Sequence, residues 1–318
     1  MTVVRVYACD GLARYAFPAG HPFGFGRLEA FWGRAQELGL ADRVQRCEGR
    51  CATREELERF HSPGYVRTVE EMSAQGSGFL DQGDTPAFPG VFDAAAFVVG
   101  AALDAAQSIM AGLARRAFLP IGGLHHARRD RAAGFCVFND CGVVIETLRR
   151  IHGIRRLAYV DIDAHHGDGI YEAFQEDAEF FVADIHEDGR FLYPGSGSAE
   201  EAGMGKAKGT KLNLPMAPGS GDKDFLRVWE QAEDFILSAR PELILFQCGA
   251  DSLAGDPIAH LAYSASAHAH AAVRLCSLAE KLGHGRLLAF GGGGYSLENV
   301  SAAWCGVLRA MIEVPVRE

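Results

Sequence analysis

The sequence predicts an α/β protein: a single domain with an open parallel sheet and helices on both faces. Short apolar runs typical of strands alternate with longer amphipathic segments typical of helices, and this repeated order indicates parallel strands joined by helical crossovers. The length of 318 residues suits one α/β domain. No internal repeat, low-complexity tract or linker interrupts the pattern, so residues 1–318 are predicted to form one domain.

The N-terminal half is predicted to contain two strands and five helices. The longest helix is apolar except for Asp93 and Asp104, and these two charges indicate a core helix and not a membrane span. Asn139 or Asp140 would cap the helix that follows the second strand. The predicted strands are 3–7 and 117–120, and the predicted helices are 27–38, 55–60, 65–72, 88–113 and 140–152.

The C-terminal half continues the alternation of strands and helices. A Gly- and Pro-rich loop that ends at Lys208 separates its second strand from the next helix. The predicted strands are 157–162, 180–183, 243–247 and 287–290, and the predicted helices are 169–174, 224–239, 264–282 and 297–312.

Composition and charge narrow the class of protein. With 48% hydrophobic and 23% charged residues, the chain is typical of a soluble globular enzyme. The net charge of −10 and the lack of any Lys/Arg-rich stripe argue against a nucleic-acid partner. The first residues are too short an apolar run for a signal peptide and contain Arg5. The eight cysteines form no CxxC pair, and most lie inside apolar runs. Because the sequence shows no secretory signal, we expect reduced thiols, a cytoplasmic protein and no membrane partner.

The densest group of carboxylates and imidazoles lies in the nine residues from Asp161 to Gly169. They directly follow the apolar run 157–160, and a buried strand rarely ends in acids unless a cation holds them. Asp163 and His165 stand two positions apart, so in extended backbone both side chains point to the same side and can reach one ion. Carboxylate and imidazole suit zinc or a similar first-row metal. The alternative is a turn whose aspartates cap the next helix.

Three further polar motifs follow other predicted strands. In an open parallel sheet the carboxyl ends of the strands share one edge, and ligands bind in the crevice there. Loops from four strands would therefore converge on one site. The additional motifs are His125-His126 after 117–120, Asp251 after 243–247, and Gly291 to Tyr295 after 287–290.

Each of these motifs has a predicted chemical role and an alternative. Asp251 is the candidate third metal ligand, and its alternative role is a helix cap. The His125-His126 pair is the candidate base, with Asp161 and Asp168 as nearby acids that could fix the tautomers; its alternative is a structural role.

Tyr295 is the candidate donor to an oxyanion. A metal held by two aspartates would lower the pKa of its bound water less than a metal held by imidazoles alone. The reaction would therefore need an additional hydrogen-bond donor to the oxyanion. The four glycines before Tyr295 allow the backbone to turn sharply and approach a ligand closely. A phosphate cradle is the rival interpretation, but the P-loop pattern is absent.

Together these motifs resemble the zinc-dependent histone deacetylase superfamily, which has the arginase/deacetylase fold, and in particular its prokaryotic members similar to acetoin utilization proteins. The match runs nearly end to end, and several of its motifs are highly specific. The matching segments are His21-Pro22, Arg27-Leu28-Glu29, Phe60-His61-Ser62, Gly83-Asp84-Thr85-Pro86, Gly122 to Ala127, Gly134-Phe135-Cys136, Asp161 to Gly169, Gly249-Ala250-Asp251, Gly255-Asp256-Pro257 and Gly291 to Tyr295.

The resemblance implies roles for the residues of the reaction centre. Zn²⁺, with Fe²⁺ as the alternative, would be held by Asp163, His165 and Asp251. A structural K⁺ would be bound by main-chain oxygens of Asp161, Asp163, His165 and Ile185, with Asp184 at a position where a serine is common.

The resemblance also implies the catalytic and substrate-binding groups. His126 would be the general base, paired with Asp168, and His125 would be its partner, paired with Asp161; Tyr295 would hydrogen-bond the substrate carbonyl. The substrate-binding residues would be Gly134, Phe135 and Tyr193 in the acyl-lysine channel, Asp84 at its rim, Ile258 directly after the Gly-Asp-Pro motif, and Arg27 behind the metal.

The activity that the resemblance implies is a metal-dependent amidohydrolase that removes acetyl groups from lysine side chains of proteins or peptides. Metal-activated water would attack the amide carbonyl, and a histidine would protonate the leaving amine. A small acetylated amine such as an acetylpolyamine is the alternative substrate, although members selective for long polyamines carry Glu where this chain has Ile258. The same residues would also be compatible with a catalytically inactive acyl-lysine binding module, and the fold is shared with arginase-type ureohydrolases.

Overall fold

The computed structural model describes residues 4–18 and 20–316 and confirms the predicted α/β architecture. Within these residues, eight strands form one sheet in which every neighbouring pair is parallel. From one edge to the other the strands are β2 (Gln45–Cys47), β1 (Arg5–Tyr7), β3 (Arg116–Leu119), β8 (Leu287–Phe290), β7 (Leu243–Gln247), β4 (Leu157–Asp161), β5 (Phe180–Glu187) and β6 (Lys211–Met216).

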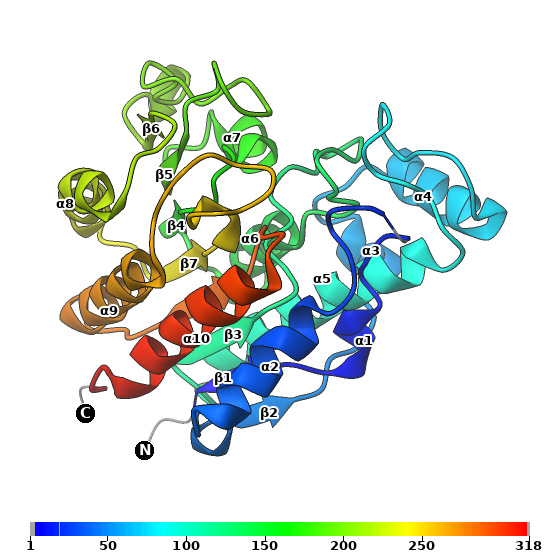
Figure 1. The fold of residues 1–318 in the computed structure, drawn as a ribbon. Helices are drawn as coiled ribbons and strands as arrows, with labels where there is room; N and C mark the ends of the chain where they lie inside the picture. The colour runs from blue at the N-terminus through cyan, green and yellow to red at the C-terminus, as the bar shows by residue number, and fades with distance from the viewer. Residues whose placement is uncertain (1–3, 19, 317–318) are drawn as a thin grey trace.

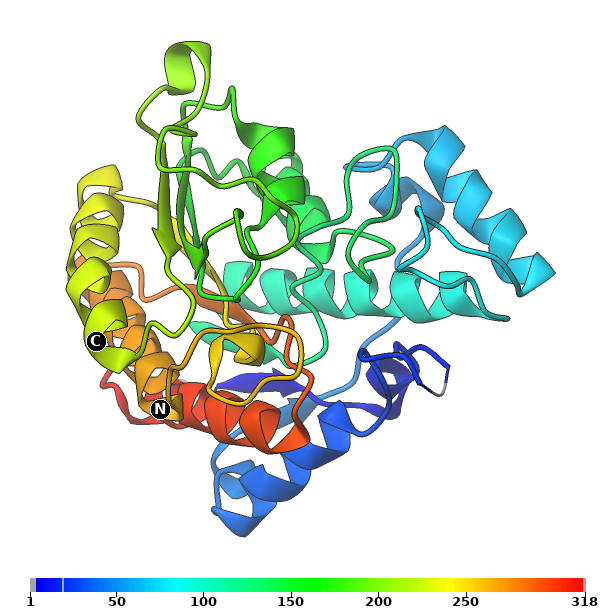
Figure 2. The same cartoon turned by 45° about the horizontal axis from the view of Figure 1, so that its top comes forward.

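Helices cover both faces of this sheet, as Figures 1 and 2 show. On one face, neighbouring helices in contact run from α2 through α10 and α9 to α8; on the other face, α5 packs against α6. The bounds of these helices are α2 (Arg27–Glu37), α5 (Val91–Met110), α6 (Asp140–His152), α8 (Asp222–Ala239), α9 (Ala265–Lys281) and α10 (Leu297–Glu313). The shorter helices are α1 (Asp10–Ala13), α3 (Arg54–Leu57), α4 (Pro63–Gln75) and α7 (Asp168–Phe174).

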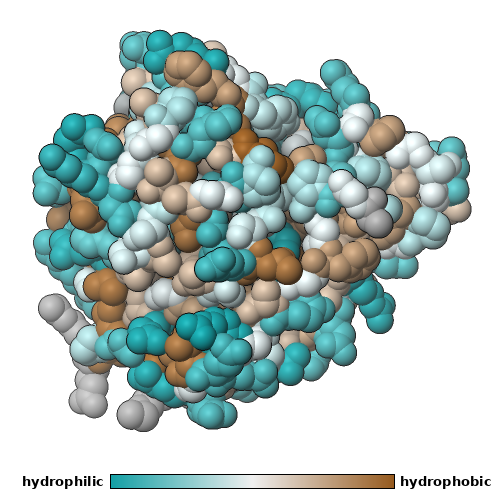
Figure 3. Space-filling view, in the orientation of Figure 1, coloured by the Kyte–Doolittle hydropathy of each residue, from teal (hydrophilic) through white to brown (hydrophobic). Residues whose placement is uncertain are grey.

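The outer surface is mixed in character. On the face of the molecule seen in Figure 3, hydrophilic residues prevail around the outside, and hydrophobic residues are scattered among them. Scattered apolar side chains are normal on a folded protein, because there is not enough polar surface to cover it. The apolar side chains of the sheet and of the inner helix faces form the buried core instead.

Helix α5 forms part of the core, as its two interrupting charges predict. Among the described helices it is the one that is long and apolar enough to cross a membrane, but 72% of its most apolar window is buried inside the protein. It is shorter than the predicted 88–113 at both ends. Gly90 stands directly before it with φ 87°, and Gly112 follows it with φ 72°, so the left-handed backbone of these glycines bounds the helix.

Two strands and one short helix are absent from the sequence-based prediction. The edge strand β2 is a three-residue polar segment that lacks an apolar run, and β6 contains Pro215, which is uncommon inside a strand. Helix α1 has only four residues. Strand β5 continues to Glu187, beyond its predicted end at 183, because it pairs with β6 as far as that residue. The buried polar residues Asp184 and His186 interrupt the apolar run from which the strand was predicted. Residue 3, the predicted start of β1, lies outside the described residues.

The four strands that precede the polar motifs are neighbours at the centre of the sheet. They are β3, β8, β7 and β4, in that spatial order, with two further strands on either side. Because all of them are parallel, the loops that follow them leave the sheet at the same edge. The topology thus brings together side chains that are more than a hundred residues apart in the chain.

Candidate active site

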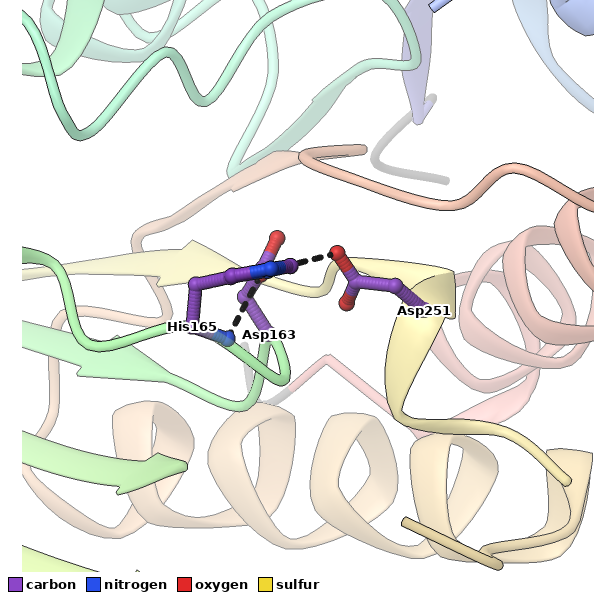
Figure 4. Close-up of side chains that lie close together, drawn as sticks. All are labelled: Asp163, His165 and Asp251. Carbon is purple, nitrogen blue, oxygen red and sulfur yellow. Dashed lines mark hydrogen bonds and ion pairs between the residues drawn. The ribbon is translucent and has the colours of Figure 1, made fainter. Parts of the chain in front are cut away.

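Three side chains from two loops meet at the carboxyl edge of the central strands. Asp163 and His165 follow β4, and Asp251 lies in a short helical turn after β7. All three are buried, and one potential ligand atom of each lies within 4.8 Å of the others. Figure 4 shows the side chains pointing toward one another, with His165 Nδ1 at 3.0 Å from Asp163 Oδ1 and 3.2 Å from Asp251 Oδ2. The three predicted ligands therefore form one compact cluster.

The chemistry of this cluster fits a divalent metal ion. Two carboxylates buried side by side repel each other, so burial and then the charge of Asp163 raise the pKa of Asp251 to about 7. A bound cation would remove that penalty. Two carboxylate oxygens and one imidazole nitrogen form a donor set that suits zinc and ferrous iron alike.

Backbone groups hold the two carboxylates in place. Gly293 N donates to Asp163 Oδ2 at 2.8 Å, and Ala164 N donates to Asp251 Oδ1 at 2.8 Å. A Cβ at Gly293 would collide with Asp251 Oδ2. The backbone can approach the acids this closely only because the residue is glycine, which is the role predicted for the glycine run before Tyr295.

Gln247 is a member of this site that sequence reasoning missed. It is fully buried at the end of β7, and its Nε2 donates to Asp163 Oδ2 at 2.8 Å while its Oε1 accepts from Gly249 N at 2.7 Å. The amide therefore links Asp163 to the loop that carries Asp251. A polar residue at the end of an otherwise apolar strand was the available signal, because a buried amide must find partners.

The two histidines form the two carboxylate pairs that the resemblance implies. His125 Nδ1 faces Asp161 Oδ2 at 2.8 Å, and His126 Nδ1 faces Asp168 Oδ1 at 2.7 Å. Their Nε2 atoms lie 3.1 Å apart. All four side chains are buried. Each carboxylate holds one ring nitrogen, so the tautomer and orientation of each imidazole are fixed.

The surroundings push the two imidazoles toward different protonation states. Burial lowers the pKa of His125, but the charges of Asp161 and Asp163 outweigh it and raise that pKa to about 10. Burial and then the charge of His125 lower the pKa of His126 to about 4, in spite of Asp168. A neutral imidazole can accept a proton, so His126 is the better placed of the two to act as a base.

Tyr295 lies on the segment between β8 and α10, directly after the glycine run. Its backbone N donates to Asp256 Oδ2 at 2.9 Å. Its ring lies edge to face against Phe23 and Phe135, with ring centres 6.4 and 5.9 Å away. Burial and then the charge of Asp251 raise its pKa well above the ordinary tyrosine value. The hydroxyl therefore stays protonated and can act as a hydrogen-bond donor.

Two aromatic side chains and a glycine line the approach to the histidines. The Tyr193 ring centre lies 5.2 Å from that of His126, and the Phe135 ring lies against Tyr295. A Cβ at Gly134 would stand 2.5 Å from His126 Cδ2 and 3.0 Å from the Tyr193 ring. No side chain fits at Gly134, because its Cβ would collide with the His126 ring.

A network of hydrogen bonds holds Phe135 in an unusual backbone conformation. Its φ is 67°, which a non-glycine residue rarely adopts. Tyr15 Oη donates to Phe135 O at 2.8 Å, and Phe135 N donates to Thr85 Oγ1 at 3.1 Å. Both partners are buried. Surroundings that tolerate such strain are typical of functional sites.

Comparison with known proteins agrees with this geometry. The model of the histone deacetylase domain matches residues 21–311. The chain belongs to the histone deacetylase family. It is 34% identical to the acetoin utilization protein AcuC of Bacillus subtilis over 92% of this chain and 78% of that protein. It is 30% identical to the histone deacetylase RPD3 of Saccharomyces cerevisiae over 95% of this chain and 70% of that protein.

A solved structure confirms the family fold. The crystal structure of the HDA15 HD domain superposes with a TM-score of 0.90 and 25% identity, over 99% of this chain and 90% of that one. The resemblance inferred from the motifs, to an AcuC-like member of the histone deacetylase superfamily, is thereby confirmed.

A hollow of about 330 Å³ lies beside Tyr193 and Asp84, and we take it as the mouth of the predicted acyl-lysine channel. Asp84 is exposed there, on a tight turn in which Asp81 Oδ1 accepts hydrogen bonds from the backbone N of Asp84 and Thr85 at 2.8 Å each. Ile258 is partly buried, and its N donates to Asp256 Oδ1 at 2.9 Å. The hollow is lined by Asp81, Gln82, Asp84, Arg128, Arg131, Ala132, Ala133 and Tyr193.

Arg27 is a buried cation next to the glycine run of the family motif. Only 3% of the residue is exposed, and its Nη2 donates to Gly292 O at 2.5 Å. The guanidinium lies over the rings of Phe23, at 4.1 Å, and Trp304, at 5.2 Å. Its Nε and Nη1 have no hydrogen-bond partner among the described residues. Two free donors in a buried position suit a small anion, as expected for a residue that handles acetate.

The residues predicted to hold potassium come from the neighbouring strands β4 and β5 and from the loop that follows β4. Asp161 of β4 lies opposite Asp184 of β5. Asp184 Oδ1 is 2.7 Å from His186 Nδ1, and Asp184 Oδ2 accepts from Gly167 N at 2.9 Å. Sequence reasoning missed His186, because it lies beyond the apolar run from which this strand is predicted. The potassium site stays a prediction, with the remaining proposed ligands at Asp163, His165 and Ile185.

Proposed function

We propose that this protein is a metal-dependent deacetylase that removes acetyl groups from lysine side chains of proteins or peptides. The observation that carries the proposal is the juxtaposition of the Asp163–His165–Asp251 cluster with two His–Asp pairs. The rings of Tyr193 and Phe135 lie against His126 and Tyr295, respectively. In this proposal residues 1–318 act as one catalytic domain in the cytoplasm, with Zn²⁺ or Fe²⁺ at the cluster and a structural K⁺.

The side chains of this chain divide the proton transfers between them. A divalent ion at the cluster would polarise the amide carbonyl and lower the pKa of water. His126 Nε2 takes a proton from the attacking water, since its Nδ1 is engaged by Asp168. The Tyr295 hydroxyl donates a hydrogen bond to the oxygen that gains negative charge. A protonated histidine then gives its proton to the leaving amine, so that the products are acetate and lysine.

Acetyl-lysine is preferred here over acetylpolyamines because of Ile258. This apolar residue directly follows the Gly255-Asp256-Pro257 motif, where family members selective for long polyamines carry a Glu that can pair with a distant ammonium. Asp84 at the mouth is exposed and free to accept hydrogen bonds from a peptide backbone. Hydrolysis of a small neutral acetyl amide is compatible with the same channel.

The proposal is tested by a substrate panel on the purified protein. Acetyl-lysine peptides, acetylpolyamines and lysine peptides with longer acyl chains are compared by kcat/KM, before and after removal of metal by a chelator. We expect acetyl-lysine peptides to be hydrolysed best and the chelated protein to be inactive. Exclusive hydrolysis of acetylpolyamines would overturn the substrate assignment.

Substitution of the ligands tests the metal cluster separately. Asp163→Ala and Asp251→Ala should each abolish activity and lower the metal content, because three protein ligands leave no redundancy. Elemental analysis of the purified variants measures the bound metal, and Asp84→Ala serves as the control that keeps all three ligands. Full metal content in Asp251→Ala would remove that residue from the ligand set.

A further inference from the structure

The two His–Asp pairs are held by different kinds of group. Asp161, the partner of His125, accepts from neutral donors: Tyr159 Oη at 2.8 Å and Asp163 N at 3.0 Å. Asp168, the partner of His126, instead faces a cation, because Arg128 Nη2 lies 2.8 Å from its Oδ2. Of the two carboxylates, Asp168, which pairs with the proposed base His126, is therefore the one that forms an ion pair with an arginine.

Arg128 extends from the channel mouth to this buried carboxylate. Its side chain is 22% exposed and lines the mouth hollow together with Asp84 and Tyr193, while Asp168 is almost fully buried. Its Nε also forms an ion pair with Glu172, which lies one turn after Asp168 on α7. The guanidinium thus binds Oδ2 of the Asp168 carboxylate, and Oδ1 remains available to His126.

We propose that Arg128 is a positioning residue for the general base, a role that rests on the proposed deacetylase function. Arg128 fixes the Asp168 carboxylate so that Oδ1 accepts the Nδ1 proton of His126. The unprotonated Nε2, which faces His125 Nε2 at 3.1 Å, is then the nitrogen that takes a proton from water. A charge-assisted hydrogen bond is stronger and more directional than one from a neutral donor. Without it, the carboxylate can rotate or accept a water from the mouth, and the tautomer of His126 is no longer fixed.

The chain offers a matched control for this role. Arg131 lines the same hollow, but its guanidinium pairs with Asp130, at 3.0 Å, and Glu172, at 3.8 Å, and with neither His–Asp pair. If kcat fell only because a positive charge was removed from the mouth, Arg128→Gln and Arg131→Gln would lower kcat equally.

The experiment compares kcat and KM of four variants on one acetyl-lysine peptide. Arg128→Gln should lower kcat roughly 10- to 100-fold, as for other groups that orient a catalytic side chain, with KM changed little. Arg128→Lys should restore most of kcat, because an ammonium can still donate to Asp168 Oδ2. Arg131→Gln and Glu172→Gln should leave kcat close to the unsubstituted protein, and metal content and Tm should be similar in all four.

Several results would overturn the inference. Equal losses in Arg128→Gln and Glu172→Gln would mean that the arginine merely ties the loop to α7. An unchanged kcat in Arg128→Gln, or a change confined to KM, would mean that it does not act on the base. Lack of hydrolysis of any acetyl amide by the unsubstituted, metal-loaded protein would instead refute the proposed function, and with it the reaction that Arg128 serves.

Discussion

The hydroxyl of Tyr295 is the one proposed catalytic group that is separate from both the metal cluster and the histidines. Tyr295→Phe keeps the ring that packs against Phe23 and Phe135, so folding and metal content should survive. Loss of one oxyanion donor costs on the order of 10²–10³ in kcat, and we expect a fall of that size with little change in KM. Steady-state kinetics on an acetyl-lysine peptide measures it. An unchanged kcat would show that another group stabilises the oxyanion.

Single residues differ in how far the sequence predicts their role. Asp163 and Asp251 were predictable as neighbours in one cluster, because both follow apolar strands of a single parallel sheet. Gln247 and Arg128 were not, because their roles depend on partners that folding supplies: Gln247 reaches Asp163, 84 positions away, and Arg128 reaches Asp168, 40 positions away. Periodicity and spacing carry no information about such pairs.

Among the helices, the packing of α5 can be tested through a glycine. Gly100 is buried on α5, and a Cβ there would collide with Arg50 O and stand 2.6 Å from Ala52 N. That segment is fastened to α5 by a hydrogen bond from Ala52 N to Ala96 O at 2.8 Å. We expect Gly100→Ala to lower the free energy of unfolding by about 1–3 kcal/mol, the usual cost of overpacking. Urea denaturation measures it.

The matched control for this prediction is Gly33, inside α2. A Cβ at Gly33 meets nothing within 4 Å. Gly33→Ala should therefore raise the free energy of unfolding by roughly 0.5–1 kcal/mol, because alanine restricts the unfolded chain and favours the helix. If both variants change stability in the same direction, close packing of α5 against residues 50–52 is not what determines the effect.

Among the helices and strands, the sequence predicts those that have a regular pattern of apolar residues. The long helices and the central strands were assigned within a few residues, since their buried faces require regular spacing of apolar side chains. The edge strand β2 consists of Gln45, Arg46 and Cys47, and its first two residues are exposed. Pairing with β1 makes it a strand, and that tertiary contact leaves no trace in the local sequence.

For the whole molecule, buried neutral histidines predict a loss of stability in acid. Burial lowers the pKa of His61 to about 3, and its Nε2 accepts from Asn139 N at 2.9 Å, which requires an unprotonated nitrogen. Between pH 6.5 and that value the unfolded chain binds a proton that the folded chain does not, so stability falls as pH falls. From pH 7 to 5 this group alone should cost about 2 kcal/mol.

The contribution of His61 is isolated by a difference between two proteins. His61→Gln keeps an oxygen that can accept from Asn139 N but cannot titrate. The change in unfolding free energy between pH 7 and 5 is measured for both the variant and the unsubstituted protein. In the difference between the two changes, the contributions of the other titrating groups cancel. We expect the variant to lose about 2 kcal/mol less over this interval. Identical pH dependence of the two proteins would mean that His61 is protonated in the folded state.

The central position of β3, β8, β7 and β4, whose loops form the candidate site, affects how local unfolding reaches that site. Local unfolding begins where backbone groups are least protected, which in a sheet means the outer strands. Here β2 and β1 lie outside β3 on one side, and β5 and β6 lie outside β4 on the other. Fraying at either edge has to pass through two strands before it reaches a loop of the site. We therefore expect the central strands β3, β8, β7 and β4 to exchange their amide protons most slowly, so that the Asp163–His165–Asp251 cluster persists while either edge of the sheet opens.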